Sequence, residues 1–248
     1  MIVNDIDIKK YGASVSSKLI QPAEIEIKKS KVGNVYTKLS SKVGFKKITI
    51  KILFEAIDRN TAYKNISDFM ANFIDEADIK FNNLEHYFHA YLTNSSIEDT
   101  EFDEWLYLNL ELDGYEYGEE VVEVMDGVIE KTIFVKGNVE TPCIVEITPK
   151  ADLSEITLKG FGDDPIVVKN LVKGNTVVID VIKGKVTCNG INKFGDVEMW
   201  EFPKLNLMKN DLIATRNICS IKVRYRLKFV WINYKVLIKA LNLYNIKS

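Results

Sequence analysis

The spacing of apolar residues in the first 57 positions predicts short β-strands. In "IVNDIDI" the side chains of Ile2, Asn4, Ile6 and Ile8 would share one face, because successive side chains of a strand point to opposite faces. The runs "EIEIKKS" and "KKITIKILFEAI" also alternate, and the second is rich in β-branched residues. Between them, "KVGNVYTKLSSKVG" is rich in Gly, Ser and Lys and predicts a loop or a hairpin arm.

The period of the apolar pattern changes in "RNTAYKNISDFMANFIDEADI". Its apolar side chains recur at three- and four-residue intervals and form the stripe of an amphipathic helix: Tyr63, Ile66, Phe69, Met70, Phe73 and Ile74. Asp58 or Asn60 is placed to cap the helix by accepting a hydrogen bond from a backbone N–H. The pattern predicts a helix over about 61–76, with Ile66, Phe69 and Phe73 as packing or interface residues.

Alternation returns in "EWLYLNLELDGYEYG" and places four leucines on one face of a strand, Leu106, Leu108, Leu110 and Leu112. A face of this kind must be covered, and the helix predicted at 61–76 is the nearest candidate. Further along, "VVEVMDGVIEKTIFVKGN" predicts a hairpin-like connector that turns at Asp126-Gly127.

The back half of the chain shows alternation without helix signals. Eight short runs fill about 90 residues: "PCIVEITP", "EITLKGF", "PIVVKNL", "NTVVIDVI", "KVTCNGI", "DVEMWEF", "DLIAT" and "SIKVRYR". Glycine-containing turns separate them, and Asn189-Gly190 is a candidate hairpin turn because both residue types tolerate positive φ. Short strands at this spacing predict a compact two-sheet sandwich of the jelly-roll type.

These patterns predict a mainly β chain with one helix and three parts. Residues 1–138 form a β-rich first domain, residues 139–229 form the sandwich, and residues 230–248 form a C-terminal tail. The tail is apolar with lysines at 235, 239 and 247, and its spacing slightly favours a helix over a strand. An apolar tail needs a partner surface, either on the first domain or on another subunit.

Charge and cysteine content narrow the functional classes. Lys plus Arg is 33 and Asp plus Glu is 35, so the net charge of −2 gives no reason to expect a surface for nucleic acid. The lysine clusters at 28, 29, 31 and at 42, 46, 47 are interpreted as solvated strand faces. Cys143, Cys188 and Cys219 lie far apart in apolar runs, which favours reduced, buried thiols and a bacterial cytoplasm.

Neither a signal peptide nor a membrane segment is predicted. The start "MIVNDIDIKKYG" has no long apolar stretch after a basic segment. No stretch approaches the roughly 20 apolar residues that a membrane helix needs. We therefore expect no membrane partner.

The sequence gives little support for a catalytic or metal-binding site. His86 and His89 are three apart in a strand-like run, which puts them on opposite faces and argues against a shared metal. The carboxylate pairs Asp163/Asp164 and Glu119/Glu120 fit solvated turns better than the acid and base of a glycosidase. No phosphate-binding loop or nucleophile elbow is present. We predict no catalytic residue, no cofactor and no metal site.

The sequence allows two interpretations of Trp200. With Tyr225 it could line a sugar groove, since sandwiches often bind carbohydrate. Its run, "VEMWEF", has no clearly apolar face, so the pattern leaves its direction open, and a packed or interface tryptophan is the more common outcome.

The order of these features resembles the distal tail protein (Dit) family of long-tailed bacteriophages and prophages. The residues that carry the resemblance are, in order, "MIVNDIDIKKYGA", "ISDFMANFI", "LELDGYEYGEE", "TPCIVEITP", "GFGDDPIVVKNL", "VTCNGINKFGDVEMWEFPKL" and "SIKVRYR". Together they span about residues 1–229. The chain departs from the family pattern after "WEFPKL", where Leu207-Met208-Lys209-Asn210 stands in place of a Pro-Gly turn before an Asn.

The resemblance implies a structural hub protein without catalysis. Its first domain would be a barrel-like or sandwich-like ring domain, and its second a galectin-like or carbohydrate-binding-module-like sandwich. First domains would assemble into a ring, usually a hexamer, between the tail tube and a tail-associated baseplate or lysin protein. The sandwich would carry receptor-binding proteins. The protein would act at the virion tail tip after assembly in the bacterial cytoplasm. Long strands, an apolar tail and only five prolines also predict self-association.

Two other functions compete with a structural hub. One is a carbohydrate-binding module for cell-wall polysaccharide, which an exposed aromatic platform would favour and buried tryptophans would weaken. The other is a cell-wall hydrolase, which needs two carboxyl groups facing each other across a cleft.

Overall fold

The computed structural model describes residues 1–32 and 34–230, which fall into two compact units. Unit 1 contains residues 1–117 and continues at Phe229, whereas unit 2 contains residues 118–228. The predicted boundary at 138 lies within unit 2, because strand β9 (Leu106–Asp126) is continuous and contributes to both units. The predicted tail lies outside the described residues, except for its first residue, Val230.

An antiparallel sheet covered by one helix forms unit 1. Its strand order is β3-β6-β9-β8-β7-β1-β2. The strands are β3 (Ala13–Ile20), β6 (Lys46–Phe54), β8 (Tyr87–Asp99), β7 (Ala77–Lys80), β1 (Ile2–Val3) and β2 (Ile6–Asp7). Among the described residues the edge strands β2 and β3 do not pair with each other, so this sheet is open and does not close into a barrel.

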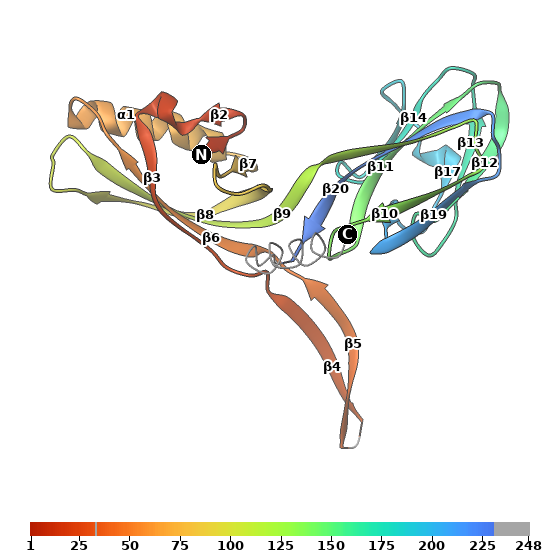
Figure 1. Cartoon of the computed structure of the whole chain (residues 1–248), viewed down its shortest axis with the longest axis horizontal. Helices are drawn as coiled ribbons and strands as arrows, with labels where there is room; N and C mark the ends of the chain where they lie inside the picture. Colours follow the sequence, from red (N-terminus) through yellow and green to blue (C-terminus); the bar gives the residue numbers. More distant parts are fainter. Residues whose placement is uncertain (33, 231–248) are drawn as a thin grey trace, which may run out of the picture. The chain divides into compact units, whose positions relative to one another are not determined.

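The leucine face of β9 forms the centre of the unit 1 core. Leu106, Leu108, Leu110 and Leu112 are all buried and pair in register with β6, with Ile52 opposite Leu108. Helix α1 (Arg59–Met70) lies along one face of the sheet (Figure 1), and its Phe69 belongs to the same core cluster as the leucines. The helix therefore covers the apolar face that the sequence pattern indicated.

Helix α1 begins two residues earlier and ends six residues earlier than predicted. Asp58 is its N-cap and accepts a hydrogen bond from the Thr61 backbone N–H at 2.8 Å. After Met70 the chain tightens into a 3-10 turn, η2 (Ala71–Phe73). Ile66, Phe69 and Phe73 are buried, but Ile74 is exposed. The prediction for Ile74 is wrong because the tighter turn changes the phase of the side chains before that residue.

The first predicted strand is interrupted. Asn4 and Asp5 both have positive φ, 47° and 64°, and form a two-residue turn that pairs β1 with β2. The chain then enters a 3-10 turn, η1 (Ile8–Tyr11). Ile2, Asn4, Ile6 and Ile8 consequently do not share a strand face; Val3 and Ile8 are the buried residues of this segment.

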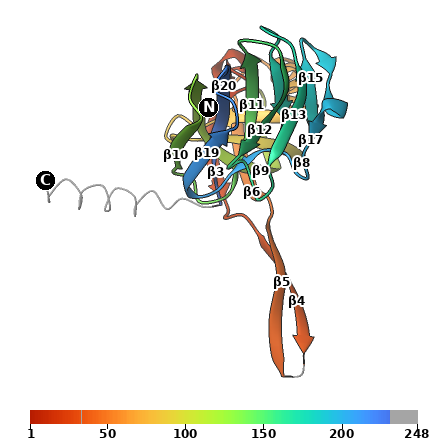
Figure 2. The ribbon, with the colours of Figure 1, turned by 90° about the vertical axis from the view of Figure 1, so that its right-hand side faces the viewer.

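A separate two-stranded sheet forms an arm on unit 1. It consists of β4 (Ile25–Val32) and β5 (Val35–Val43), which pair only with each other among the described strands. Figures 1 and 2 both show this hairpin as a ribbon that leaves the ends of β3 and β6. The hairpin alternative for the Gly-, Ser- and Lys-rich segment is therefore the observed one.

Two packed sheets form unit 2. One has the order β16-β15-β14-β11-β20, followed by the end of β9, and the other has the order β10-β19-β12-β13-β17. The strands of the first sheet are β11 (Thr141–Pro149), β14 (Val177–Asp180), β15 (Lys185–Cys188), β16 (Ile191–Asn192) and β20 (Cys219–Phe229). Those of the second are β10 (Glu130–Val135), β12 (Leu153–Lys159), β13 (Ile166–Leu171), β17 (Val197–Glu198) and β19 (Met208–Ala214). A short strand, β18 (Lys204–Leu205), also pairs with β11, and the turn η3 (Phe194–Asp196) precedes β17.

The core of unit 2 lies between these two sheets. Val145 and Val223 from the first sheet and Ile156, Val168 and Leu212 from the second are all buried in one cluster. Each of the eight alternating runs contains a strand, since one strand face packs inward. Among the described residues, no helix has the length and hydropathy needed to cross a membrane.

The predicted hairpin at Asp126-Gly127 is wrong. The chain does turn there, with Gly127 at φ 68°. However, β10 pairs with β19 in the second sheet, while the end of β9 lies in the first sheet. An Asp-Gly turn reverses the chain but does not select its partner strand, and here the segment crosses between the two layers of the sandwich.

The turn before β19 is formed without the expected glycine. Met208 adopts φ 67°, a conformation that residues with a Cβ rarely occupy. The Asn210 side chain bridges the turn, since its Oδ1 accepts from the Asn206 N–H at 2.8 Å and its Nδ2 donates to the Asn206 carbonyl at 2.9 Å. Side-chain hydrogen bonds thus hold a turn in which a glycine would be free of strain.

Candidate interaction surfaces

The β4–β5 arm exposes apolar side chains along a hairpin. Six of them are exposed: Ile25, Ile27, Val35, Tyr36, Leu39 and Val43. Every residue of β5 is exposed. A lone two-stranded hairpin has marginal stability in water, and monomeric proteins rarely display such a strip of apolar residues. The arm therefore has the composition of a surface that another molecule covers.

A buried ionic cluster lies in unit 1 where β6 begins. Lys46 is only 1% exposed and Glu116 only 3% exposed. The Lys46 Nζ lies 2.5 Å from the Glu116 Oε2, and the His86 Nδ1 lies 2.8 Å from the Glu116 Oε1. The His86 ring stacks on Phe229 with centroids 4.3 Å apart. One carboxylate thus joins β6, β9 and the segment before β8.

The interpretation of Lys46 as part of a solvated strand face is wrong. In "KKITIKILF" Lys46 is in phase with Ile48, Ile50 and Ile52, all of which are buried. The alternation that predicted the strand therefore also contained the signal for Lys46 burial. Lys47, one residue later, has the opposite phase and forms an exposed ion pair with Glu24.

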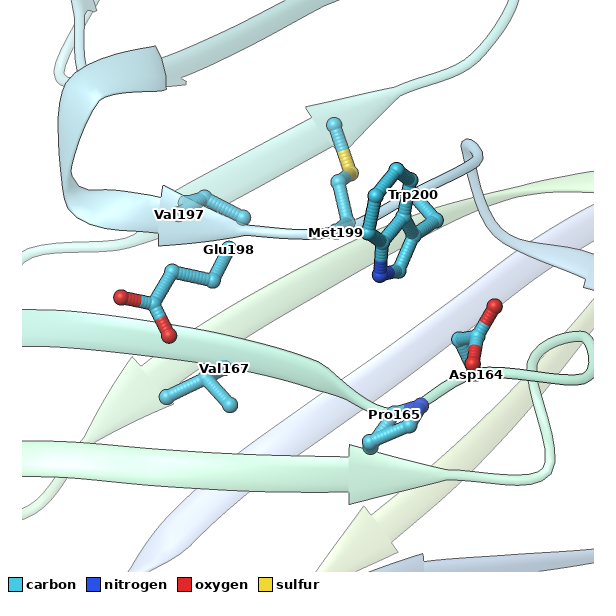
Figure 3. Close-up of a pocket in the computed structure, with 7 residues that line it drawn as sticks. All are labelled: Asp164, Pro165, Val167, Val197, Glu198, Met199 and Trp200. Atoms are coloured by element: carbon cyan, nitrogen blue, oxygen red, sulfur yellow. The ribbon is translucent and has the colours of Figure 1, made fainter.

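A shallow groove lies at the edge of the second sheet of unit 2. It has a volume of about 460 Å³ and is lined by Asp164, Pro165, Val167, Val197, Glu198, Met199 and Trp200. Trp200 is 89% exposed, so its indole is not packed into the core. Figure 3 shows Asp164 and Pro165 on the segment that faces this indole across the groove.

Strand pairing fixes the direction of the residues just before Trp200, which itself lies beyond the end of β17. Val197 pairs with Val168 on the core side, so Glu198 and Val167 lie on the outer face. Trp200 follows Glu198 by two residues, and Met199 packs partly against the core. Tyr225, in contrast, is buried between the sheets. The proposed pairing of Trp200 with Tyr225 in one groove is therefore wrong.

The remaining candidate residues stay apart. His89 contacts Asp78 at 2.7 Å, whereas His86 contacts Glu116. Within residues 1–32 and 34–230, no group of three His, Cys, Asp or Glu residues is placed to hold a metal ion. Asp163, Asp164, Glu119 and Glu120 are all exposed.

Comparison with known proteins identifies the type of domain. Residues 136–229 match the family of the siphovirus-type tail component, C-terminal domain. No curated protein matches the chain significantly. Among solved structures, the Dit protein of phage SPP1, described as a paradigm of hub adsorption apparatus in Gram-positive infecting phages, has a TM-score of 0.70. It covers 92% of this chain and 98% of its own chain at 11% identity. Residues 136–229 therefore belong to the family of siphovirus-type tail component C-terminal domains, and the chain as a whole has the fold of a Dit protein.

Baseplate structures share the Dit fold with this chain. A chain from the phage P2 baseplate in its activated conformation with Ca has a TM-score of 0.57 at 11% identity, covering 91% of this chain and 94% of its own. The same baseplate with Sr has a TM-score of 0.54 at 12% identity, with 88% and 92% covered. At such identities the likeness concerns the fold, and it includes both units of this chain.

Asn189 and Gly190 occupy a hairpin turn in unit 2. They connect β15 and β16, with Cys188 paired to Ile191 and φ values of 50° and 81°. Positive φ at both central positions is the geometry of a type I′ turn, which matches the right-handed twist of the flanking strands.

Two of the three thiols of this chain are buried in unit 2. Cys143 and Cys219 are buried and Cys188 is half-buried, and all three are free. Burial raises the pKa of the Cys143 thiol far above its ordinary value, because a thiolate there would lose its hydration. Cys143 therefore behaves as a small apolar residue of the core.

Proposed function

We propose that this chain is a structural hub at the distal end of a phage or phage-like tail, where copies form a ring that joins the tail tube to the tail tip or baseplate. The observation that carries the proposal is the combination of a Dit-family domain at residues 136–229 with a Dit fold that extends over 92% of the chain. A hub acts by holding other proteins in position, so its function resides in its surfaces and requires no catalytic group.

The arm supports ring formation by unit 1. A heterologous contact, in which one surface of a copy meets a different surface of the next, closes into a ring when the rotation between copies is a simple fraction of a turn. The β4–β5 arm supplies one such surface, because it exposes apolar side chains that the described residues of unit 1 leave uncovered. Burying Tyr36 and Leu39 against a neighbour would stabilise each contact by about 1.5–3 kcal/mol per side chain. We propose a hexamer.

The partners of the ring follow from this role. One face of the ring contacts the tail tube protein, and the other contacts a tail-associated baseplate or lysin protein. Unit 2 carries a receptor-binding protein. The site of action is the virion tail tip, and assembly takes place in the bacterial cytoplasm. We propose no enzymatic activity.

Imaging and mass measurement test the ring. Negative-stain microscopy of the purified chain is expected to show rings with a central hole, and light scattering after size exclusion is expected to give about six chains per particle. A wild-type protein that stays monomeric at every concentration would contradict the proposal.

Two variants test the arm. The double variant Tyr36→Ser/Leu39→Ser is expected to shift rings toward monomers, because each lost apolar contact weakens association by more than about tenfold. Ile182→Ser is the matched control, since Ile182 is equally exposed but lies in the turn between β14 and β15 of unit 2. If the double variant forms rings as stable as those of the control, the arm does not contribute to the ring contact.

A further inference from the structure

We propose that the Trp200 groove of unit 2 binds an uncharged saccharide, with the indole stacking on a pyranose ring and Asp164 accepting hydrogen bonds from its hydroxyl groups. The proposal does not depend on ring formation, because every residue of the groove lies in unit 2.

The indole is the first element of the site. A tryptophan that is 89% exposed leaves a large apolar face in water, where burial against an apolar surface would stabilise it. A pyranose ring presents a flat face of C–H groups that matches the indole in size. Met199 lies beside the indole, and Pro165 and Val167 add apolar side chains on the opposite segment of the groove (Figure 3).

The carboxylates supply the polar contacts. Glu198 forms an ion pair with Lys169 across the β13–β17 pair. Asp164 is exposed, and within the described residues its carboxylate makes no hydrogen bond or ion pair. An ionised carboxylate only accepts hydrogen bonds, and sugar hydroxyl groups are donors that suit it.

The charge around the groove selects the class of saccharide. Both ionisable residues that line it are acidic, and Asp163 adds a further exposed carboxylate beside Asp164. A phosphate-rich polymer would bring like charge to these groups, which costs free energy in a partly desolvated groove. An uncharged saccharide avoids this repulsion.

The edge of the sheet argues against a peptide strand as the occupant. Strand β17 is the end strand of its sheet but has only two residues, Val197 and Glu198. Strand addition draws its affinity from a row of main-chain hydrogen bonds, and a two-residue edge offers very few of them. The volume of about 460 Å³ also suits one or two sugar rings better than a folded partner.

Titration calorimetry on the full chain tests the proposal. The probes are soluble, uncharged oligosaccharides of glucose, galactose, rhamnose and N-acetylglucosamine, with an oligomer of glycerol phosphate as the charged comparison. At least one uncharged probe is expected to bind with a Kd of about 1 mM or tighter, and the phosphate oligomer is expected not to bind. Trp200→Ala should weaken binding by at least about tenfold, and Trp200→Phe by less, because phenylalanine retains a smaller stacking face.

Asp164→Asn and Asp163→Asn form a matched pair. Only the first is expected to weaken binding, since Asp164 lines the groove and its neighbour does not. The proposal is overturned if no uncharged probe binds, if binding survives Trp200→Ala, or if the phosphate oligomer binds best. The proposal is also overturned if the wild-type chain binds no sugar and Trp200→Ala abolishes binding of a receptor-binding protein, because the groove would then be a protein-binding site. If the Trp200→Ala variant still forms rings, its loss of saccharide binding is independent of the ring contact that the arm variants test.

Discussion

Replacing Lys46 with methionine removes the cation from a buried ion pair while keeping a long apolar side chain. The Glu116 carboxylate would then stay buried without its lysine partner, while its contact with His86 is kept. Side-chain exposures of 2% for Lys46 and 3% for Glu116 mean that water cannot replace the lost partner. Breaking such a pair costs about 3–5 kcal/mol, which is a large part of the 5–15 kcal/mol typical of a domain.

Lys47→Met is the matched control one residue away. Its ion pair with Glu24 spans 3.3 Å between side chains that are 59% and 68% exposed, and exposed pairs contribute about 0–1 kcal/mol. Thermal unfolding followed by circular dichroism measures the overall effect, and hydrogen exchange in peptides from β6 and β9 assigns the loss to unit 1.

A second variant isolates the physical reason. Lys46→Met/Glu116→Leu removes both charges and is expected to recover much of the loss, because no buried charge remains without its partner. The reasoning is refuted if Lys46→Met is no more harmful than Lys47→Met, or if the double variant is less stable than the single one.

Three further predictions concern backbone geometry and thiol chemistry. Gly114→Ala should destabilise unit 1 by about 1–3 kcal/mol in chemical unfolding. A Cβ at this position would lie 2.5 Å from the His89 carbonyl oxygen and 2.8 Å from the Ala90 Cβ. Gly195→Ala is the control and should have no measurable effect, because the space around Gly195 is open. Met208→Val should lower the free energy of unfolding by about 1–2 kcal/mol, whereas Met208→Gly should leave it unchanged. The Met208 side chain is exposed, so the two variants differ mainly in how well they tolerate the positive φ at this position. Equal melting temperatures for the two variants would contradict backbone strain at that turn. Iodoacetamide at pH 8 should modify the half-buried Cys188 first and leave Cys143 unmodified in the folded protein, because burial raises the pKa of Cys143. Peptide mass spectrometry measures the order of modification. Early alkylation of Cys143 would contradict its burial in a closed core.

Local patterns in the sequence were sufficient to predict helix α1, the buried face of β9 and the burial of Lys46. The helical stripe located α1, and the alternation of leucines located the buried face of β9. The same alternation already contained the burial of Lys46, which its phase with Ile48 shows. These features are local because a helix or strand repeats its geometry every few residues, so that the side-chain pattern reports which face is buried.

The direction of Trp200 and the partner of each strand were decided only by the tertiary structure. "VEMWEF" has two mixed faces, so its alternation could not say which side of the sheet Trp200 would occupy. The pairing of β17 with β13, about 30 residues earlier in the chain, sets the outward direction of Glu198, and Trp200 lies exposed just beyond that strand. Likewise, the turn after β9 reverses the chain, yet β10 pairs with β19, some 80 residues later. Strand pairing depends on which distant faces bury each other best, and that competition has no local signature in the sequence.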